Sequence, residues 1–165
     1  MVEQRADLFL SIHADSSPDR TVAGTAVYTL NDRAENRARQ RAHQGPGPTD
    51  QVDVNNILVE LELREKRNQS TAFAEVLLEH LATAGPLLQN PHRQANLFVL
   101  LDPRVPAVLL EMGFITNRND EANLTSAAAR RRQMGAVVSG IDAYFSQRGD
   151  VGPLQENASR VLPAR

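Results

Sequence analysis

Two stretches of the sequence end in side chains that can bind a metal ion or move a proton. An apolar run at residues 8–12 leads directly to His13 and Asp15. Residues two apart in an extended chain point the same way, so these two side chains could face one ion. A second apolar run, residues 108–110, leads to Glu111. A carboxylate buried at a strand end is costly unless it is paired or functional, and burial raises its pKa toward the range useful to a general base.

Each of these residues also has a structural interpretation. His13 can be a histidine at the rim of the core, hydrogen-bonded to the backbone. Asp15 can form an Asx turn at the strand exit, which the Ser-Ser-Pro sequence after it favours. Glu111 can be an acid in a salt bridge, with Arg93 or Arg104 as its partner. The sequence pattern leaves both interpretations open at all three positions.

Arg93 is a candidate for substrate binding. It follows His92 in a polar stretch that is typical of a linker before an expected strand. Its planar guanidinium suits bidentate pairing with a carboxylate on a substrate. The alternative is a solvated arginine in a loop.

Strands and helices alternate along the chain, and these elements must position the candidate residues. Apolar and β-branched runs predict the strands, and turn and capping signals predict where helices begin. The expected strands are residues 8–12, 24–30, 98–100 and 107–110. The expected helices are residues 31–43, a long helix from Asp50 or Asp53 to about residue 84, and a final helix that follows a turn at residues 117–120 and is capped by Thr125 or Ser126. This alternation predicts an α/β fold.

Two of the expected helices carry apolar stripes at helical spacing, which predict the faces that they bury. The stripe of the long helix is Phe73, Val76, Leu77, His80, Leu81 and Ala84. The stripe of the final helix is Met134, Val137, Val138, Ile141 and Phe145.

Composition limits the function classes. The 165 residues fit one domain with a real core, and 41% hydrophobic and 23% charged residues are ordinary for a globular protein. A net charge of −2 gives no electrostatic support for binding nucleic acid. The absence of cysteine excludes disulfides and thiolate zinc sites. No apolar run approaches the ~20 residues of a membrane span, and no signal peptide opens this chain.

Three stretches in this order resemble the catalytic domain of the zinc-dependent N-acetylmuramoyl-L-alanine amidases: residues 6–15, 24–28 and 105–117. The resemblance covers roughly residues 5–147 and implies hydrolysis of the amide between the lactyl group of N-acetylmuramic acid and L-alanine in peptidoglycan. By this resemblance His13 corresponds to a Zn²⁺ ligand and Glu111 to the catalytic glutamate. It also implies a three-layer α/β/α fold with a mixed, mostly parallel sheet, whose first strand or strands we expect this chain to lack.

The family has a second histidine ligand and a glutamate ligand in a segment that precedes the matched one. We therefore expect this chain to lack two zinc ligands, with Asp15 as an accessory ligand, and by itself to bind zinc weakly or not at all and to show no hydrolysis. An alternative within the same fold is a non-catalytic module that binds peptidoglycan or regulates another protein. A third reading is an unrelated α/β domain in which His13 and Glu111 are structural.

The match is to the cell-division type of amidase, which implies further features. Residues 1–147 would form the catalytic domain, with a helical insertion at about residues 32–70, and residues 148–165 a disordered tail. An acid of the insertion, Asp32 or Glu35, could occupy a metal position in an inhibited state. The implied partner is an activator with a LytM-type domain. The complete protein would be a periplasmic or extracellular monomer.

Overall fold

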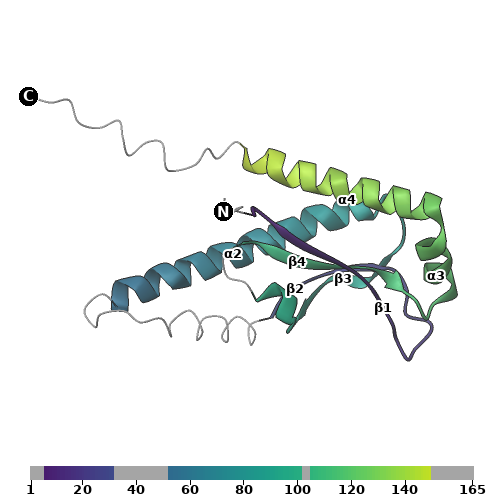
Figure 1. The fold of residues 1–165 in the computed structure, drawn as a ribbon, viewed down its shortest axis with the longest axis horizontal. Coiled ribbons are helices and arrows are strands. Elements are labelled where there is room, and N and C mark those ends of the chain that lie inside the picture. Colours follow the sequence, from purple (N-terminus) through teal and green to yellow (C-terminus); the bar gives the residue numbers. More distant parts are fainter. Residues whose placement is uncertain (1–5, 32–51, 102–104, 150–165) are drawn as a thin grey trace, which may run out of the picture.

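The structure is a computed structural model that describes residues 6–31, 52–101 and 105–149. In these residues the chain forms three helices, four strands and a 3-10 turn (Figure 1). The strands are β1 (Phe9–Asp15), β2 (Thr25–Leu30), β3 (Leu87–Ala95) and β4 (Ala107–Phe114). The helices are α2 (Val52–Leu81), α3 (Arg118–Thr125) and α4 (Ala127–Arg148), and the 3-10 turn is η1 (Phe98–Leu100).

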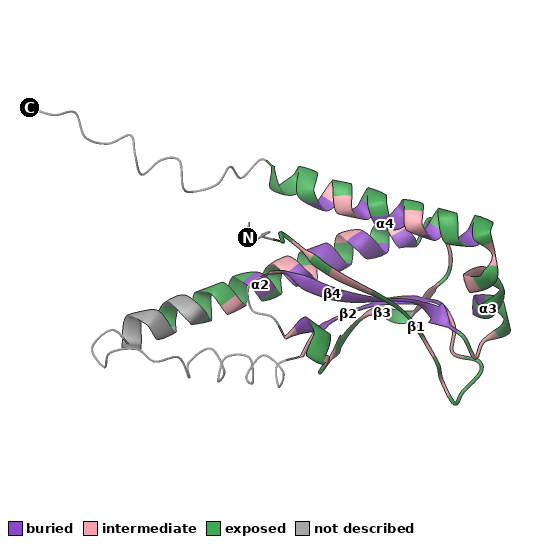
Figure 2. Ribbon diagram, in the orientation of Figure 1, coloured by how far each residue is buried: buried purple, intermediate pink, exposed green. Residues whose placement is uncertain are grey.

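The described strands form one sheet in the order β1-β4-β2-β3. The pairs β1–β4 and β2–β3 are parallel, and β2–β4 is antiparallel. The predicted α/β fold with a mixed, mostly parallel sheet is therefore confirmed. β4 lies in the interior of the sheet and is buried at every position, while β1 is an edge strand with exposed residues (Figure 2).

Helices α2 and α4 cover one face of the sheet. Alternate residues of the central strands, Val27, Val108 and Leu110, point into the same buried cluster as side chains from both helices. The largest fully buried side chains of α2 are Phe73, Leu77 and Leu81, which confirms the centre of its predicted stripe. Full burial of such a side chain stabilises the fold by about 1.5–3 kcal/mol. Whether a second helical layer covers the opposite face stays a prediction.

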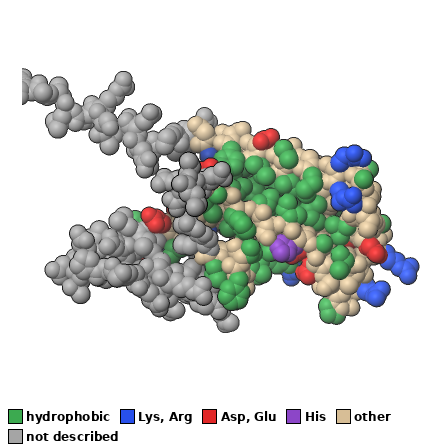
Figure 3. Space-filling view, in the orientation of Figure 1, with side chains coloured by type: hydrophobic (Ala, Val, Ile, Leu, Met, Phe, Trp, Pro, Cys, Tyr) green, Lys and Arg blue, Asp and Glu red, His purple; other side chains and the backbone are tan. Residues whose placement is uncertain are grey.

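The apolar stripe predicted for the final helix is wrong in part. Val138 is 57% exposed and Phe145 is 38% exposed. Exposed hydrophobic side chains are common in this protein, and Figure 3 shows many of them gathered on one face of the molecule. The buried face of α4 is set by smaller residues, because Gly140 lets the helix approach α2 until a Cβ there would lie 3.1 Å from Leu77 Cδ1. The buried residues of α4 are Ala129, Gln133, Ala136, Val137, Gly140 and Tyr144.

Two expectations between the long helix and β4 are also wrong. Residues 98–100 form a 3-10 turn rather than a strand, and the stretch read as a polar linker is the edge strand β3. Asn90 and Pro91 look like turn residues, and they form an irregularity in β3, where Asn90 has a φ of 54°. An edge strand tolerates such an interruption, because its outer groups need no partner strand.

The expected turn at residues 117–120 is a helix start. Asn117 caps α3, and its Oδ1 accepts hydrogen bonds from the backbone N–H groups of Asn119 (3.0 Å) and Asp120 (3.4 Å). Ser126, rather than Thr125, caps α4, with its Oγ 3.3 Å from the backbone nitrogen of Ala129. Both caps satisfy amide groups that a helix leaves without partners.

The predicted helix at residues 31–43, the acids Asp32 and Glu35, and most of the expected tail lie outside the described residues. The described part of the expected insertion, residues 52–70, belongs to the continuous helix α2. None of the helices in the described ranges is long and apolar enough to cross a membrane.

Candidate active site

His13 and Glu111 are neighbours across the β1–β4 pair. The register places the two residues directly side by side on parallel strands, about 4.8 Å apart. Paired residues of neighbouring strands point to the same face, and the next residue of β4 on each side, Leu110 and Met112, points to the helical layer. His13 and Glu111 therefore project from the face of the sheet opposite α2 and α4.

Glu111 has an environment that suits proton transfer. It is 8% exposed, and its Oε2 atom is buried without a hydrogen-bond partner in the described part of the chain. Burial, and to a smaller extent the negative charge of Asp15, raises the pKa of Glu111 from 4.5 to about 7. A carboxyl group with this pKa can both accept and donate a proton near neutral pH.

β4 carries a bulge immediately after Glu111. Between the pairs His13–Glu111 and Asp15–Phe114, β1 advances by two residues and β4 by three. Gly113 lies in the bulge with a φ of 150°, a backbone angle that residues other than glycine rarely adopt.

Asp15 also makes a local hydrogen bond at the strand exit, but it is not the Asx turn that the sequence suggested, because the backbone N–H of Ser17 donates to the Thr116 hydroxyl group instead. Its Oδ1 accepts a hydrogen bond from the backbone nitrogen of Ser16 at 2.7 Å. Asp15 thus combines a local bond to Ser16 with a negative charge that acts on Glu111.

The imidazole of His13 is exposed and makes a side-chain hydrogen bond. Its Nε2 lies 2.7 Å from the hydroxyl oxygen of Ser11, two residues earlier on the same strand. The ring is thus held by a hydroxyl group rather than by the backbone, and its Nδ1 atom remains for another contact. This is an arrangement in which a histidine can bind a metal, with Ser11 fixing the ring.

Arg93 lies on the same face of the sheet as Glu111. It pairs in register with Tyr28, which pairs with Leu109, two residues before Glu111 on β4. Its Nη1 donates to the Tyr28 hydroxyl at 3.3 Å, and its guanidinium lies 5.9 Å from the centre of the Tyr28 ring. Strand spacing puts the Cα atoms of Arg93 and Glu111 roughly 12 Å apart. The two residues form no ion pair in the described structure, and Arg104 lies outside it, so the salt-bridge interpretation of Glu111 gains no support.

The described residues do not form a complete zinc site. No group of three or more His, Asp or Glu side chains that could hold a metal ion occurs in the described ranges. A catalytic zinc needs about three protein ligands and an open position. His13 fits as one ligand, and the accessory role of Asp15 stays a prediction.

Asp120, which the sequence indicated only as part of a turn, lies in the first turn of α3 and contacts the end of β4. Asp120 is 5% exposed, and its Oδ2 accepts hydrogen bonds from the backbone nitrogens of Gly24 (2.8 Å) and Phe114 (2.9 Å). The available signal was Asn117 three residues earlier, since this spacing is typical of a helix cap with an acid in the first turn.

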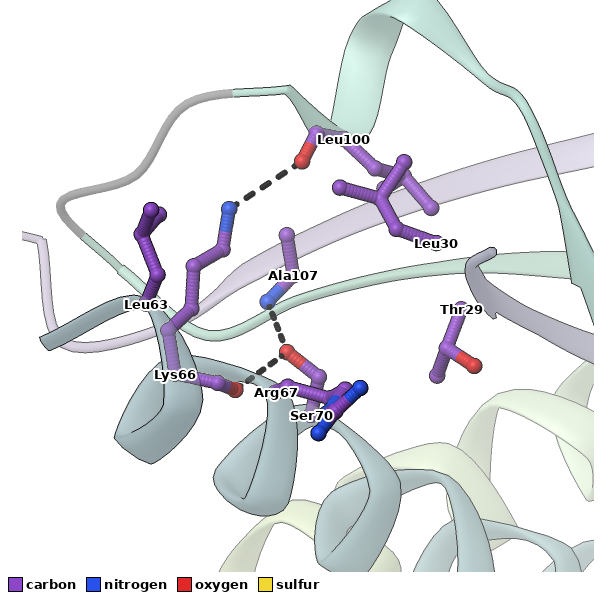
Figure 4. Close-up of a pocket in the computed structure, with 8 residues that line it drawn as sticks. All are labelled: Thr29, Leu30, Leu63, Lys66, Arg67, Ser70, Leu100 and Ala107. Atoms are coloured by element: carbon purple, nitrogen blue, oxygen red, sulfur yellow. Dashed lines mark hydrogen bonds between the residues drawn. The ribbon is translucent and has the colours of Figure 1, made fainter. Parts of the chain in front are cut away.

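A pocket lies at the other end of β4. Figure 4 shows Lys66 donating to the carbonyl oxygen of Leu100, and Ser70 between the backbone of α2 and the amide of Ala107. Its interior of about 20 Å³ holds roughly one water molecule. Ala107 precedes Glu111 by four residues, roughly 13 Å along a strand. The pocket is therefore too small and too distant to be the substrate site.

Comparison with known proteins gives a consistent family match. A family model described as N-acetylmuramoyl-L-alanine amidase matches residues 1–143. The chain is 32% identical over 152 residues to the N-acetylmuramoyl-L-alanine amidase AmiA of Escherichia coli strain K12, which covers 85% of this chain and 52% of AmiA. It is 29% identical over 154 residues to AmiC of Escherichia coli O6:H1, which covers 87% of this chain and 37% of AmiC.

A solved structure also matches the fold. The catalytic domain of CwlV, an N-acetylmuramoyl-L-alanine amidase from Bacillus (Paenibacillus) polymyxa var. colistinus, superimposes with a TM-score of 0.59 at 26% identity. The match covers 86% of this chain and 59% of the CwlV chain. The chain thus spans about half or less of the length of the two curated relatives that it matches.

Proposed function

The chain belongs to the N-acetylmuramoyl-L-alanine amidase family, and we propose that it serves to hydrolyse the amide between the lactyl group of N-acetylmuramic acid and L-alanine in peptidoglycan. The observation that carries this proposal is Glu111. Its carboxyl group is buried, leaves Oε2 without a partner in the described structure, and lies beside His13. An unpartnered buried carboxyl group lowers stability, which favours a role in the reaction over a role in the fold.

Glu111 acts as the general base and then as the general acid. Its carboxylate removes a proton from the water that attacks the amide carbonyl carbon. The tetrahedral intermediate collapses when the C–N bond breaks, and Glu111 passes the same proton to the departing amine of L-alanine. A pKa near 7 suits both transfers, because neither protonation state is strongly disfavoured at neutral pH.

Zinc dependence is part of the proposal. His13 is a candidate ligand because its ring is exposed and anchored by Ser11. The described residues hold no cluster of three possible metal ligands, so the further ligands would come from residues outside the described ranges.

Arg93 and Tyr28 extend the candidate site along the same face of the sheet. Stem peptides carry carboxylates, and an exposed guanidinium steadied by an aromatic ring can bind one of them. The position of Arg93, roughly 12 Å from Glu111, suits a carboxylate several bonds from the scissile amide.

Three further features belong to the proposal and follow from the family. The setting is the cell wall, in the periplasm or outside the cell, and a role in cell division is what the resemblance to the cell-division type of amidase implies. An activator with a LytM-type domain stays a prediction.

The alternative function is a module that binds peptidoglycan without cleaving it. This alternative gives no reason for the unpartnered oxygen of Glu111.

The test uses the gene product that carries this sequence, in its full natural length and supplied with Zn²⁺. Purified sacculi are incubated with it, and the soluble products are identified by mass spectrometry. Release of peptides with a free amino-terminal L-alanine, from glycan strands of unchanged length, is the expected result. Binding to sacculi with no peptide release would overturn the proposal in favour of the binding module.

A further inference from the structure

One buried oxygen atom connects the two strands that meet at Glu111. Asp120 lies in the first turn of α3, and its Oδ2 accepts the backbone N–H of Gly24 at 2.8 Å and that of Phe114 at 2.9 Å. Hydrogen bonds to a carboxylate are roughly twice as strong as neutral ones. Since Asp120 is 5% exposed, water does not compete readily for these bonds.

The two amides belong to the backbone around Glu111. Gly24 immediately precedes β2, and Ala26, two residues later, lies directly opposite Glu111 in the antiparallel pair. Phe114 ends β4, three residues after Glu111, and pairs with Asp15 on β1. Asp120 therefore fixes β2 against β4 within three residues of the candidate general base.

The local backbone is shaped to admit this carboxylate. Gly113 has a φ of 150°, and a Cβ there would lie 3.1 Å from the Cβ, Cγ and Oδ2 atoms of Asp120. Gly24 has a φ of 103°, and a Cβ there would lie 2.6 Å from the backbone of Leu87. Both positive φ values favour glycine, and at Gly113 the missing side chain also leaves room for the close approach of Asp120.

Asn117 holds the same turn from the other side. Its Oδ1 accepts from the backbone nitrogen of Asp120, and its Nδ2 donates to the carbonyl oxygen of Arg20 at 2.8 Å. The backbone N–H of Ser17 also donates to the hydroxyl oxygen of Thr116 at 3.0 Å. The loop after β1 and the loop after β4 are thus fastened together at the end of the sheet where His13 and Glu111 lie.

We propose that Asp120 is a positioning residue for Glu111: it fixes the β4 bulge and the start of β2, and so holds the Glu111 carboxyl group in its place beside His13. Its effect on catalysis rests on the proposed function, but its effect on the backbone does not. Displacement of a catalytic group by about 1 Å can lower the rate by about 100-fold.

The first measurement is hydrogen exchange of the backbone amides by NMR, and it needs no activity. In Asp120→Ala, the amides of Gly24 and Phe114 and the β2–β4 ladder beside Glu111 should lose protection, while those of α4 keep it. Asp120→Asn should retain most of the protection, because its amide oxygen still accepts both bonds. Unchanged protection in Asp120→Ala, or an equal loss across the whole fold, would overturn the proposal.

The second measurement is hydrolysis by the full-length, zinc-supplied gene product well below its melting temperature. Asp120→Ala should lower kcat by about 100-fold with little change in KM, and Asp120→Asn should recover kcat to within about tenfold of the wild type. Ser126→Ala, which removes the cap of α4, is the matched control, because it destabilises the fold without touching the Glu111 corner. An equal loss of kcat in Ser126→Ala would contradict the proposal. If the wild type does not hydrolyse peptidoglycan, the proposed function fails and the exchange measurement alone decides the role of Asp120.

Discussion

His13 on β1 and Glu111 on β4 are register partners, and both side chains project from the face of the sheet opposite the helical layer. One of them is exposed and held by a hydroxyl group, and the other is buried with an oxygen atom that has no partner in the described structure. This pairing combines a metal-binding group and a proton-transfer group on adjacent strands.

The stability of the protein should depend on pH through Glu111. The folded-state pKa of about 7 lies above the unfolded value of 4.5, so the folded protein holds a proton that the unfolded chain releases in this window. The contribution of Glu111 to the free energy of unfolding therefore falls as pH rises from 4.5 to 7, by about 3 kcal/mol at most. Urea unfolding at several pH values measures it.

Glu111→Gln isolates this contribution from those of other acids. The variant should match the wild type near pH 4.5 and be more stable at pH 8, because the amide is never charged. Glu79→Gln, at an exposed position of α2, is the control and should show no such divergence. A difference between Glu111→Gln and wild type that stays constant from pH 4.5 to 8 would show that the carboxyl group is not strained by burial.

Zinc binding should depend on His13. In the full-length gene product, His13→Ala should weaken zinc binding by at least about 100-fold, because even the loss of a residue behind a ligand costs 10–100-fold. His92→Ala is the control, because His92 contacts Thr29 on the opposite face. Competition with a coloured chelator gives the affinities. Full affinity in His13→Ala would refute the assignment.

Arg93 should determine the affinity for anionic stem peptides. Arg93→Ala should raise KM by about 10–100-fold with little change in kcat, which corresponds to the loss of one hydrogen bond to a charged group. The exposed Arg132 of α4 provides the control variant, Arg132→Ala. Steady-state kinetics with native and amidated stem peptides separates charge recognition from packing. If Arg93→Ala impairs both substrates equally, Arg93 does not bind the carboxylate.

Two glycine substitutions should have opposite effects on stability. Gly24→Ala should lower the free energy of unfolding by more than about 1 kcal/mol, because its φ is positive and its Cβ would lie 2.6 Å from the Leu87 backbone. Gly135→Ala, at an exposed position of α4 with nothing within 4 Å of its Cβ, should raise it by about 0.5–1 kcal/mol. Thermal unfolding of the two variants tests both, and a stabilising Gly24→Ala would show that the contact with β3 is looser than described.

The sequence was sufficient to predict the parts of the fold that depend on strong local patterns. The apolar runs before His13 and Glu111 are strands, and the spacing of Phe73, Leu77 and Leu81 marks the buried face of α2. Both patterns arise because the side chains are buried against many neighbours. Strands and helix faces of this kind can therefore be predicted from the sequence alone.

The errors came where tertiary contacts override local pattern. Asn90 and Pro91 have turn propensity, yet β2 pairs with the chain on either side of them and makes it a strand. Val138 and Phe145 are apolar but exposed, because Gly140 brings a different face of α4 onto α2. Asp120 could not be recognised, since its two partners are separated by 96 and 6 residues along the chain.

The central claim is that Glu111 transfers the proton in amide hydrolysis, and its most direct test is the kcat of Glu111→Gln. The full-length, zinc-supplied gene product and its variant are assayed on a muropeptide with an L-alanine amide at pH 7.5, a value above the raised pKa of about 7. We predict that the folded variant binds the substrate normally and that its kcat falls by about 10²–10⁴-fold, the usual contribution of general acid–base catalysis. A folded Glu111→Gln with wild-type kcat would contradict the account.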